Sequence, residues 1–585
     1  MSREVPDRRF INYPKPIEAT KTTYKASFFW SNAGFGVLRQ LGELIKYEPR
    51  YDPTVIRKGT QLPNDADLLC QSEILYSRAD SGSPSTRIEH FNAAYQSGEI
   101  TPVKVVEVVL DLIEKASHKA TFVSVKRDDV FTAAKASAQR FKEGKARSLL
   151  DGVPVAVKDG TLSDKNADEV DLDGHSKALG SRMRFTSPEG GTSWCVRKWE
   201  EAGAIIIGKL NMHEYGLDTC GNNPLTGTPM NPQNPSYYPG GSSSASATTV
   251  SSNLLPLTLG VDGGGSIRIP SSFCGIYGLK PTHGRISRSP TISAAFSTSV
   301  AGPMAGSMKD LELGYRIMAT PNPNDGVNVL FAPPLPPFPL PSFTTNPKVL
   351  GICRPWFDAA DPAVLTICDD ALSHYRTQGY DMIDISIPYL HEGQLAHAMT
   401  ILTEASAAAP PSLSQFSAPN KILLSVARQT PAHDLLLAQK MRDLLMTHLA
   451  HLFKQHPGLL IVSPTTPIAG WTIGSEKEVK GLGEGGYGVS DANTSVRNMT
   501  YVWLANFTGC PAISVPVGMA EGVKGRVPVG LMAMGEWGDE EDLIEWGKVG
   551  EDWAWGKDGG MEKPAAERWV DVLALAGARR EVESN

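Results

Sequence analysis

The sequence predicts an α/β fold around a mixed, mostly parallel sheet. Helix-length and strand-length apolar segments alternate over most of the chain, as they do in such folds. Residues 153–157 are continuously apolar, which is typical of a strand that is buried on both faces. Residues 103–115 instead carry apolar side chains at helical spacing. Thr101-Pro102 precedes them and supplies an N-cap and a proline at the first helical position.

Length and charge set the first limits on domain number and partners. A chain of 585 residues exceeds the roughly 250–300 residues at which single cores stop growing, so two or more domains, or one large domain with additions, are expected. The net charge is −7 and the pI is about 6.0, with no run rich in Lys or Arg. A nucleic-acid partner is therefore not expected.

Cysteine usage and the N-terminus predict a cytoplasmic protein. The seven cysteines are scattered and form no C-x-x-C pair, so neither a disulfide framework nor a thiolate metal site is expected. The first 16 residues lack the apolar core of a secretion signal. No apolar run reaches the roughly 20 residues that a transmembrane helix needs.

Two Gly/Ser-rich segments carry the strongest functional signal. We call residues 239–245 the first Gly/Ser loop and residues 260–270 the second Gly/Ser loop. Such clusters are often only flexible loops. In the second loop, however, three glycines precede Ser266, and glycines allow several backbone N–H groups to converge on one point. A carbonyl bound there would have donors for its developing negative charge, and Ser266 could attack it.

A nucleophilic serine needs a base to accept its proton. His213 and His283 are candidates, but neither belongs to a recognisable triad, and no G-x-S-x-G motif surrounds Ser266. Lys158 follows the five apolar residues of the predicted buried strand. Desolvation lowers the pKa of a buried lysine and makes a neutral amine available near pH 7. The alternative is that Lys158 leaves the sheet edge and pairs with Asp159.

These segments together resemble the amidase signature family. The resemblance is carried by a lysine ending a G-[IV]-P-[IV]-x-[VI]-K-D strand at residues 152–159, by a G-G-S-S loop at 240–243, and by G-x-D-x-G-G-S-[IV]-R-x-P at 260–270. Similar segments continue from about residue 85 to about residue 550. Two departures are Ser244-Ala245, where the family has two glycines, and Gly263, where it often has Thr or Ile.

The resemblance implies a role for each matching residue. Ser266 matches the nucleophile, Ser242 a bridging serine held by a cis peptide bond, and Lys158 the base. The backbone N–H groups that match the oxyanion hole are those of Gly263, Gly264, Gly265 and Ser266. Ser243 is expected to support the relay, and Asp262 and Arg268 to orient the loop. The implied fold is a large twisted sheet covered by helices on both faces.

The implied activity is hydrolysis of a carboxylic amide, with esters as further candidates, through an acyl-enzyme and without a metal or organic cofactor. Three alternatives stay open: acyl transfer to an amine, a glutamine-dependent amidotransferase A-type subunit, and a non-catalytic binding protein on the same scaffold. The expected ligand is a small-molecule amide, and a homodimer stays open.

The resemblance also divides the chain into an N-terminal extension (1–84), a catalytic domain (85–550) and a C-terminal tail (551–585). Substrate contacts are expected near Met212, near Thr226 and in the Gly-rich loop at residues 470–495, by their general position alone.

Overall fold

The computed structural model describes most of the chain after the N-terminal extension. The described residues are 83–115, 118, 120–159, 179–181, 191–291, 293–334, 348–473, 491–556 and 560–583. The extension expected at residues 1–84 therefore lies almost entirely outside the described residues. Most of the Gly-rich loop, residues 474–490, also lies outside them.

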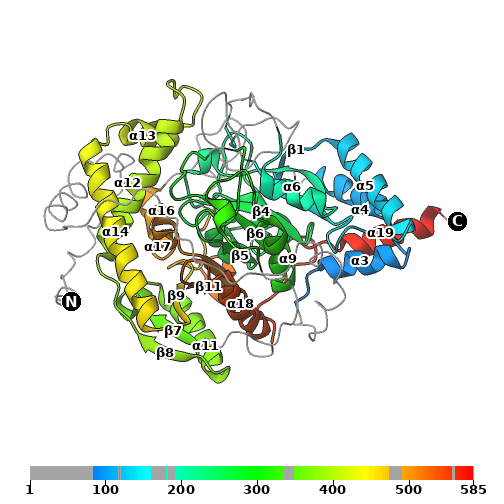
Figure 1. Cartoon of the computed structure of the whole chain (residues 1–585). Helices are drawn as coiled ribbons and strands as arrows, with labels where there is room; N and C mark the ends of the chain where they lie inside the picture. Colours follow the sequence, from blue (N-terminus) through cyan, green and yellow to red (C-terminus); the bar gives the residue numbers. More distant parts are fainter. Residues whose placement is uncertain are drawn as a thin grey trace.

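One sheet of eleven strands forms the centre of the protein (Figure 1). The strand order is β1-β3-β2-β4-β6-β5-β10-β11-β9-β7-β8. In that order the strands span Phe122–Ser124, Ile205–Leu210, Pro154–Lys158, Leu257–Asp262, Val300–Ala305, Tyr277–Lys280, Ala512–Gly522, Gly525–Met534, Leu459–Pro464, Val349–Ile352 and Asp381–Asp384. The predicted strand at 153–157 corresponds to β2, and every residue of β2 is buried.

The sheet is mixed, as predicted, but the expectation that it is mostly parallel is wrong. Among the described strands, six of the ten neighbouring pairs are antiparallel and four are parallel. The parallel pairs are β2 with β3 and β4, and β7 with β8 and β9. A continuously apolar strand indicates burial on both faces and does not report the direction of its neighbours.

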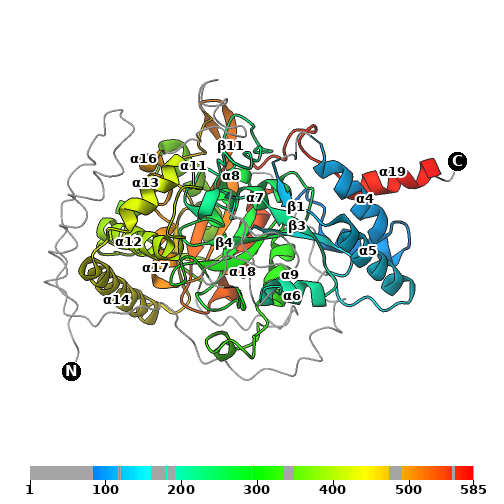
Figure 2. The same cartoon turned by 90° about the horizontal axis from the view of Figure 1, so that it is seen from above.

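Helices cover both faces of the sheet. Figure 2 shows α7 and α8 on one side of β4, and α9 and α18 on the other. On the first side, α7 and α8 contact each other and the central strands. On the second side, α18 contacts both α9 and α11, and all three helices contact central strands. These helices span Ser244–Ser251 (α7), Arg268–Cys274 (α8), Met308–Met318 (α9), Pro362–Thr377 (α11) and Glu540–Ala554 (α18).

Two further groups of helices flank the two ends of the sheet (Figure 1). Near β1 lie α3 (Ile88–Gln96), α4 (Pro102–Ile113), α5 (Arg127–Lys142) and α19 (Val572–Glu583), and α19 packs against α4. At the opposite end, α12 (Leu390–Ala408) contacts α13 (Ala418–Ala427), α14 (Ala432–Gln455) and α17 (Trp503–Thr508). The remaining helices are α6 (Trp194–Glu201), α10 (Arg354–Phe357) and α16 (Ala492–Asn498).

Helix α4 begins where the sequence predicts. Thr101 is its N-cap and accepts a hydrogen bond from the N–H of Lys104 (3.4 Å), and Pro102 is its first residue. The apolar face of α4 joins the main core. No helix in the described part of the chain is long and apolar enough to cross a membrane.

Glycines allow the strands around the two loops to approach closely. In β6, Gly302 pairs with Gly260 of β4, and a side chain at Gly302 would overlap the carbonyl oxygen of Leu279 in β5. The absence of a Cβ at Gly302 therefore lets β6 fit between its two neighbours.

We expect Gly302→Ala to destabilise the fold strongly. The added methyl group meets backbone rather than a flexible side chain, so relief requires movement of a central strand, and the cost should reach about 3 kcal/mol. Thermal unfolding of the purified variant measures the loss. Gly326→Ala is the matched control because a Cβ there meets nothing within 4 Å. Equal unfolding temperatures for the two variants would contradict the strand-spacing argument.

Candidate functional site

Lys158 ends strand β2 and points its amine at the first Gly/Ser loop. Its Nζ donates to Ser242 Oγ at 2.8 Å and to the carbonyl of Val261 at 3.2 Å. Lys158 and Ser242 are both fully buried. The neighbouring Asp159, the alternative partner in the sequence, forms an ion pair with Lys209 of β3 (3.6 Å). The strand thus delivers an amine to a serine hydroxyl in a site screened from water.

The first Gly/Ser loop is held against the second by direct hydrogen bonds. The peptide bond between Gly241 and Ser242 is cis, as the resemblance indicated. The N–H of Ser243 donates to the carbonyl of Ser266 (3.1 Å), and the Ser243 hydroxyl donates to the carbonyl of Val261 (3.2 Å). Ser243 therefore joins the loop that carries Ser242 to the turn that carries Ser266.

Ser266 lies in the turn between β4 and α8, and it differs from its two partners in exposure. It is only half-buried, whereas Lys158 and Ser242 are fully buried. The three side chains thus comprise a buried amine, a buried hydroxyl bonded to it, and a hydroxyl that is partly accessible.

Asp262 and Arg268 hold this turn together from within. Both side chains are fully buried. Arg268 donates to the carboxylate of Asp262 from Nε (3.0 Å) and from Nη2 (3.1 Å). The same carboxylate accepts the N–H groups of Gly265 (2.7 Å) and Ile267 (3.1 Å). The structural roles expected for Asp262 and Arg268 thus have a geometric basis.

The charge of Asp262 is stabilised where it lies. Burial alone would raise its pKa, but the Arg268 guanidinium, with Lys280 and the N–H of Gly265, outweighs burial and holds the pKa of Asp262 below its ordinary value. Because the pKa in the folded state is depressed, the stability from this pair is present above the pKa of an unfolded aspartate. It is lost only when the pH falls through the lower folded value.

One of the four predicted oxyanion donors is already engaged. The N–H of Gly265 donates to Asp262 Oδ1, which corrects the expectation that it is available to a ligand. Within the described residues, the N–H groups of Gly263, Gly264 and Ser266 make no hydrogen bond. Three candidate donors therefore remain beside the Ser266 hydroxyl.

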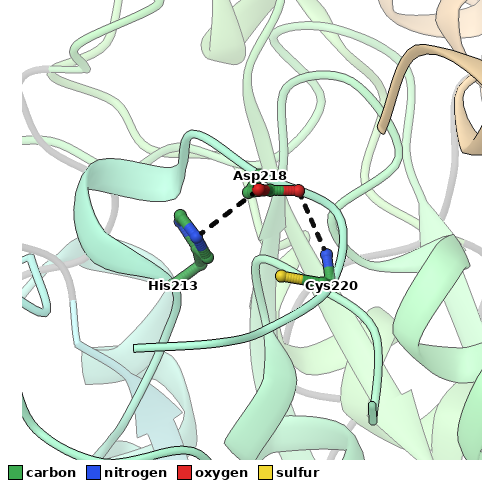
Figure 3. Close-up of side chains that lie close together, drawn as sticks. All are labelled: His213, Asp218 and Cys220. Carbon is green, nitrogen blue, oxygen red and sulfur yellow. Dashed lines mark hydrogen bonds and ion pairs between the residues drawn. The ribbon is translucent and has the colours of Figure 1, made fainter. Parts of the chain in front are cut away.

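His213 lies behind the first Gly/Ser loop. Its backbone N–H donates to the carbonyl of Ser242 (3.1 Å), and its Nδ1 lies 3.2 Å from the carbonyl of Glu214. Figure 3 shows its ring facing Asp218, with Nε2 3.9 Å from Oδ2, and Asp218 also accepts the N–H of Cys220 (3.4 Å). These contacts support the loop from its buried side.

The same three side chains are a group that could contact a single metal ion. The ligand atoms of His213, Asp218 and Cys220 lie within 4.8 Å of one another. Asp218 Oδ1, however, already accepts hydrogen bonds from the N–H of Thr219 and the hydroxyl of Ser495, so that oxygen is satisfied without an ion. The expectation of no metal stays a prediction.

The two predicted substrate contacts have structural partners. Met212 is fully buried in an apolar cluster that includes Tyr215 and Phe416. Thr226 is half-buried, and its hydroxyl donates to Asn211 Oδ1 (2.7 Å).

His283, the other histidine that the sequence offered as a base, bonds through Nε2 to the carbonyl of Phe296 (2.7 Å).

Two residues to which the sequence analysis assigned no role also contact the second Gly/Ser loop. Asn506 of α17 donates to Asp262 Oδ1 (2.9 Å) and accepts from Arg268 Nη2 (2.6 Å). His397 of α12 lies 2.9 Å from the carbonyl of Gly263. These positions are 244 and 134 residues from their partners, so the contacts cannot be inferred from neighbouring sequence.

We expect Asp262→Asn to destabilise the protein by about 3–5 kcal/mol, because it leaves the buried Arg268 without a compensating charge. Unfolding in urea measures the change. Asp361→Asn is the control: Asp361 pairs with Arg497 at the surface, with side chains 46% and 49% exposed, and its loss should cost about 1 kcal/mol or less. Similar losses for both variants would rule out a special contribution from Asp262.

Comparisons with known proteins agree with the fold and with the loop motifs. Residues 104–544 match the family described as Amidase. A fatty acid amide hydrolase from Medicago truncatula is 33% identical over 466 residues, covering 77% of this chain and 73% of the relative. The A-type subunit of the glutamyl-tRNA(Gln) amidotransferase from Chloroflexus aurantiacus is 29% identical over 496 residues, covering 78% of this chain and 94% of the relative.

Solved structures show the same architecture. A bacterial aryl acylamidase of the amidase signature family superposes with a TM-score of 0.67 at 21% identity, covering 80% of this chain and 96% of that chain. The peptide amidase of Stenotrophomonas maltophilia superposes with a TM-score of 0.63 at 22% identity, covering 83% and 99%. At these identities the likeness establishes the fold. The family match establishes the membership: this chain belongs to the amidase signature family.

Proposed function

We infer that this chain is an amidase that cleaves the C–N bond of a carboxylic amide through an acyl-enzyme on Ser266. One observation carries the proposed relay. Lys158 Nζ lies 2.8 Å from Ser242 Oγ, and the loop that holds Ser242 is hydrogen-bonded to the turn that holds Ser266. This arrangement links the buried amine directly to the first hydroxyl and holds the loop of Ser242 against the turn that carries Ser266, the hydroxyl to be activated.

The first half of the reaction moves one proton inward. When Lys158 is neutral, its contact with Ser242 can reverse: an N–H of the amine stays on the carbonyl of Val261, and the lone pair accepts from the Ser242 hydroxyl. Lys158 takes the proton of Ser242 as Ser242 takes that of Ser266, and the Ser266 oxygen forms a bond to the amide carbon. The carbonyl π electrons move onto oxygen and give a tetrahedral oxyanion.

The second half returns the proton. The relay passes it to the departing nitrogen as the C–N bond breaks, because an unprotonated amide anion is a very poor leaving group. Water then attacks the acyl-enzyme, gives its proton to the same relay and releases the acid. The free N–H groups of Gly263, Gly264 and Ser266 are the proposed donors to the oxyanion in both halves.

Amides of fatty acids are the proposed substrate class. The relatives named fatty acid amide hydrolase from Medicago truncatula and Arabidopsis thaliana are 33% and 31% identical to this chain. The loop after β3 also places Met212 in an apolar cluster, directly before the residue whose N–H binds Ser242. An apolar cluster so near the loop favours an acyl chain over a polar amino acid as the group bound beside it.

The domain organisation and the location are further parts of the proposal. The catalytic unit spans residues 85–550, and the extension and the tail are additions to it. The tail helix α19 packs on α4 and contributes Arg579, which pairs with Asp111. We keep the cytoplasm as the proposed location.

We expect Ser266→Ala to abolish amide hydrolysis and to prevent labelling by a fluorophosphonate, because the variant has no attacking oxygen. Hydrolysis of an acyl amide series and intact mass after labelling provide the readouts. Ser373→Ala, which removes an exposed hydroxyl on α11, is the matched control and should keep both properties. An active Ser266→Ala variant would disprove the assignment.

The same series tests the substrate class. For a buried chain, kcat/KM should rise with length, since each buried CH₂ contributes about 0.8 kcal/mol, or roughly fourfold. A preference for glutamine without a length trend would indicate the amidotransferase reaction instead. Product formation with an added amine would indicate acyl transfer.

We expect kcat/KM to rise from acid to alkaline pH, because only unprotonated Lys158 can accept the serine proton. A pH profile measured on a neutral substrate tests this expectation. A rate that peaks below pH 6 would contradict the assignment of Lys158 as base.

A further inference from the structure

Helix α12 reaches the second Gly/Ser loop through a buried histidine. His397 is fully buried, and its Nε2 lies 2.9 Å from the carbonyl oxygen of Gly263. A carbonyl oxygen can only accept, so Nε2 carries the hydrogen and donates it. Ile401, one turn further along the same face of α12, also borders Gly263.

The hydrogen bond from His397 acts on the peptide unit that joins Gly263 to Gly264. The carbonyl of Gly263 and the N–H of Gly264 belong to one planar, trans peptide, in which the C=O and N–H bonds point in opposite directions. Holding the carbonyl towards α12 therefore turns the N–H of Gly264 away from α12. A hydrogen bond to the carbonyl also polarises the peptide and strengthens the N–H as a donor.

The loop has little freedom to rotate away from this arrangement. A Cβ on Gly264 would lie 3.1 Å from His397 Cε1 and 2.8 Å from Met499 Cε, and one on Gly263 would lie 3.0 Å from Ile401 Cδ1. The backbone of the loop therefore packs directly on the side chains of α12 and of the segment after α16.

The imidazole is neutral and makes one polar contact within the described part of the chain. Burial is the largest effect on its pKa, and with the nearby Arg442 it lowers the pKa to about 4 despite the bond to Gly263. Its Nδ1 is buried without a hydrogen-bond partner among the described residues. An unpaired buried nitrogen destabilises the fold, and a leucine at this place would avoid that cost.

We propose that His397 is a positioning residue that fixes the Gly263–Gly264 peptide and so aims the Gly264 N–H at the oxyanion. The proposal rests on the proposed function, since it assigns a cause to the orientation of one of its donors. A residue that influences the reaction would therefore lie on α12, whose sequence is otherwise typical of a helix that packs in a core.

The test compares His397→Leu, His397→Gln and His391→Leu. Leucine fills the space without a donor, and the Gln side-chain amide can donate from near the former position of Nε2. His391 is exposed on the same helix, so its replacement controls for the substitution itself. The readouts are kcat, KM, the melting temperature and inhibition by a trifluoromethyl ketone, which forms an oxyanion when Ser266 adds to it.

We expect His397→Leu to lower kcat by about 10- to 100-fold, somewhat less than deletion of an oxyanion donor, and to leave KM within about threefold. Affinity for the ketone should fall in parallel with kcat. His397→Gln should recover most of the loss, and His391→Leu should match the wild type. If His397 served only to pack the core, its replacement would instead change the melting temperature without lowering kcat selectively over KM.

Two results would overturn the proposal: kcat of His397→Leu within about threefold of the wild type, or an equal loss in His397→Gln. If the leucine variant does not fold, His397→Met replaces it in the comparison. A wild-type protein without Ser266-dependent amide hydrolysis would instead disprove the proposed function, so that activity is measured first.

Discussion

The buried ion pair between Asp262 and Arg268 is the constraint on which the site depends. A turn with three consecutive glycines has no conformation of its own, because glycine populates many backbone states. The carboxylate of Asp262 selects one of them by accepting the N–H groups of Gly265 and Ile267. Arg268 compensates the buried charge, and Asn506 completes the hydrogen bonding. The N–H groups that this network leaves unbound among the described residues are the proposed oxyanion donors.

Exposure along the relay is graded, and the gradient suits the proposed order of events. Lys158 and Ser242 are fully buried, while Ser266 is partly accessible. The accessible end of the proposed relay is the only one that a substrate needs to meet.

Local sequence was sufficient for the features that depend on neighbouring residues. The apolar run before Lys158 predicts β2, and Thr101-Pro102 predicts the start of α4. Resemblance to the amidase signature family predicted which serines would lie near Lys158, and the 2.8 Å contact with Ser242 agrees with it. Strand direction was mispredicted, because a strand covered on both faces looks the same in either direction.

Contacts between distant parts of the chain could not be predicted in the same way. The Gly265 N–H was expected to be free, since the sequence does not show that Asp262 folds back on the turn. His397 is one of two histidines in α12, and Asn506 lies in an apolar stretch; neither position reveals its partner. Only the packing of α12 and α17 on the loop gives them partners.

Antiparallel insertion of β6 between β4 and β5 has a consequence for how this enzyme can diversify. The strand brings Gly302 against Gly260, at the base of the second Gly/Ser loop, and the spacing there tolerates no side chain. Substitutions at this level of β4 and β6 would displace the reacting groups before they changed which ligand binds. Adaptation to new amides is therefore expected outside this part of the sheet, for example where the chain after β3 meets α12 and α13 around the buried Met212.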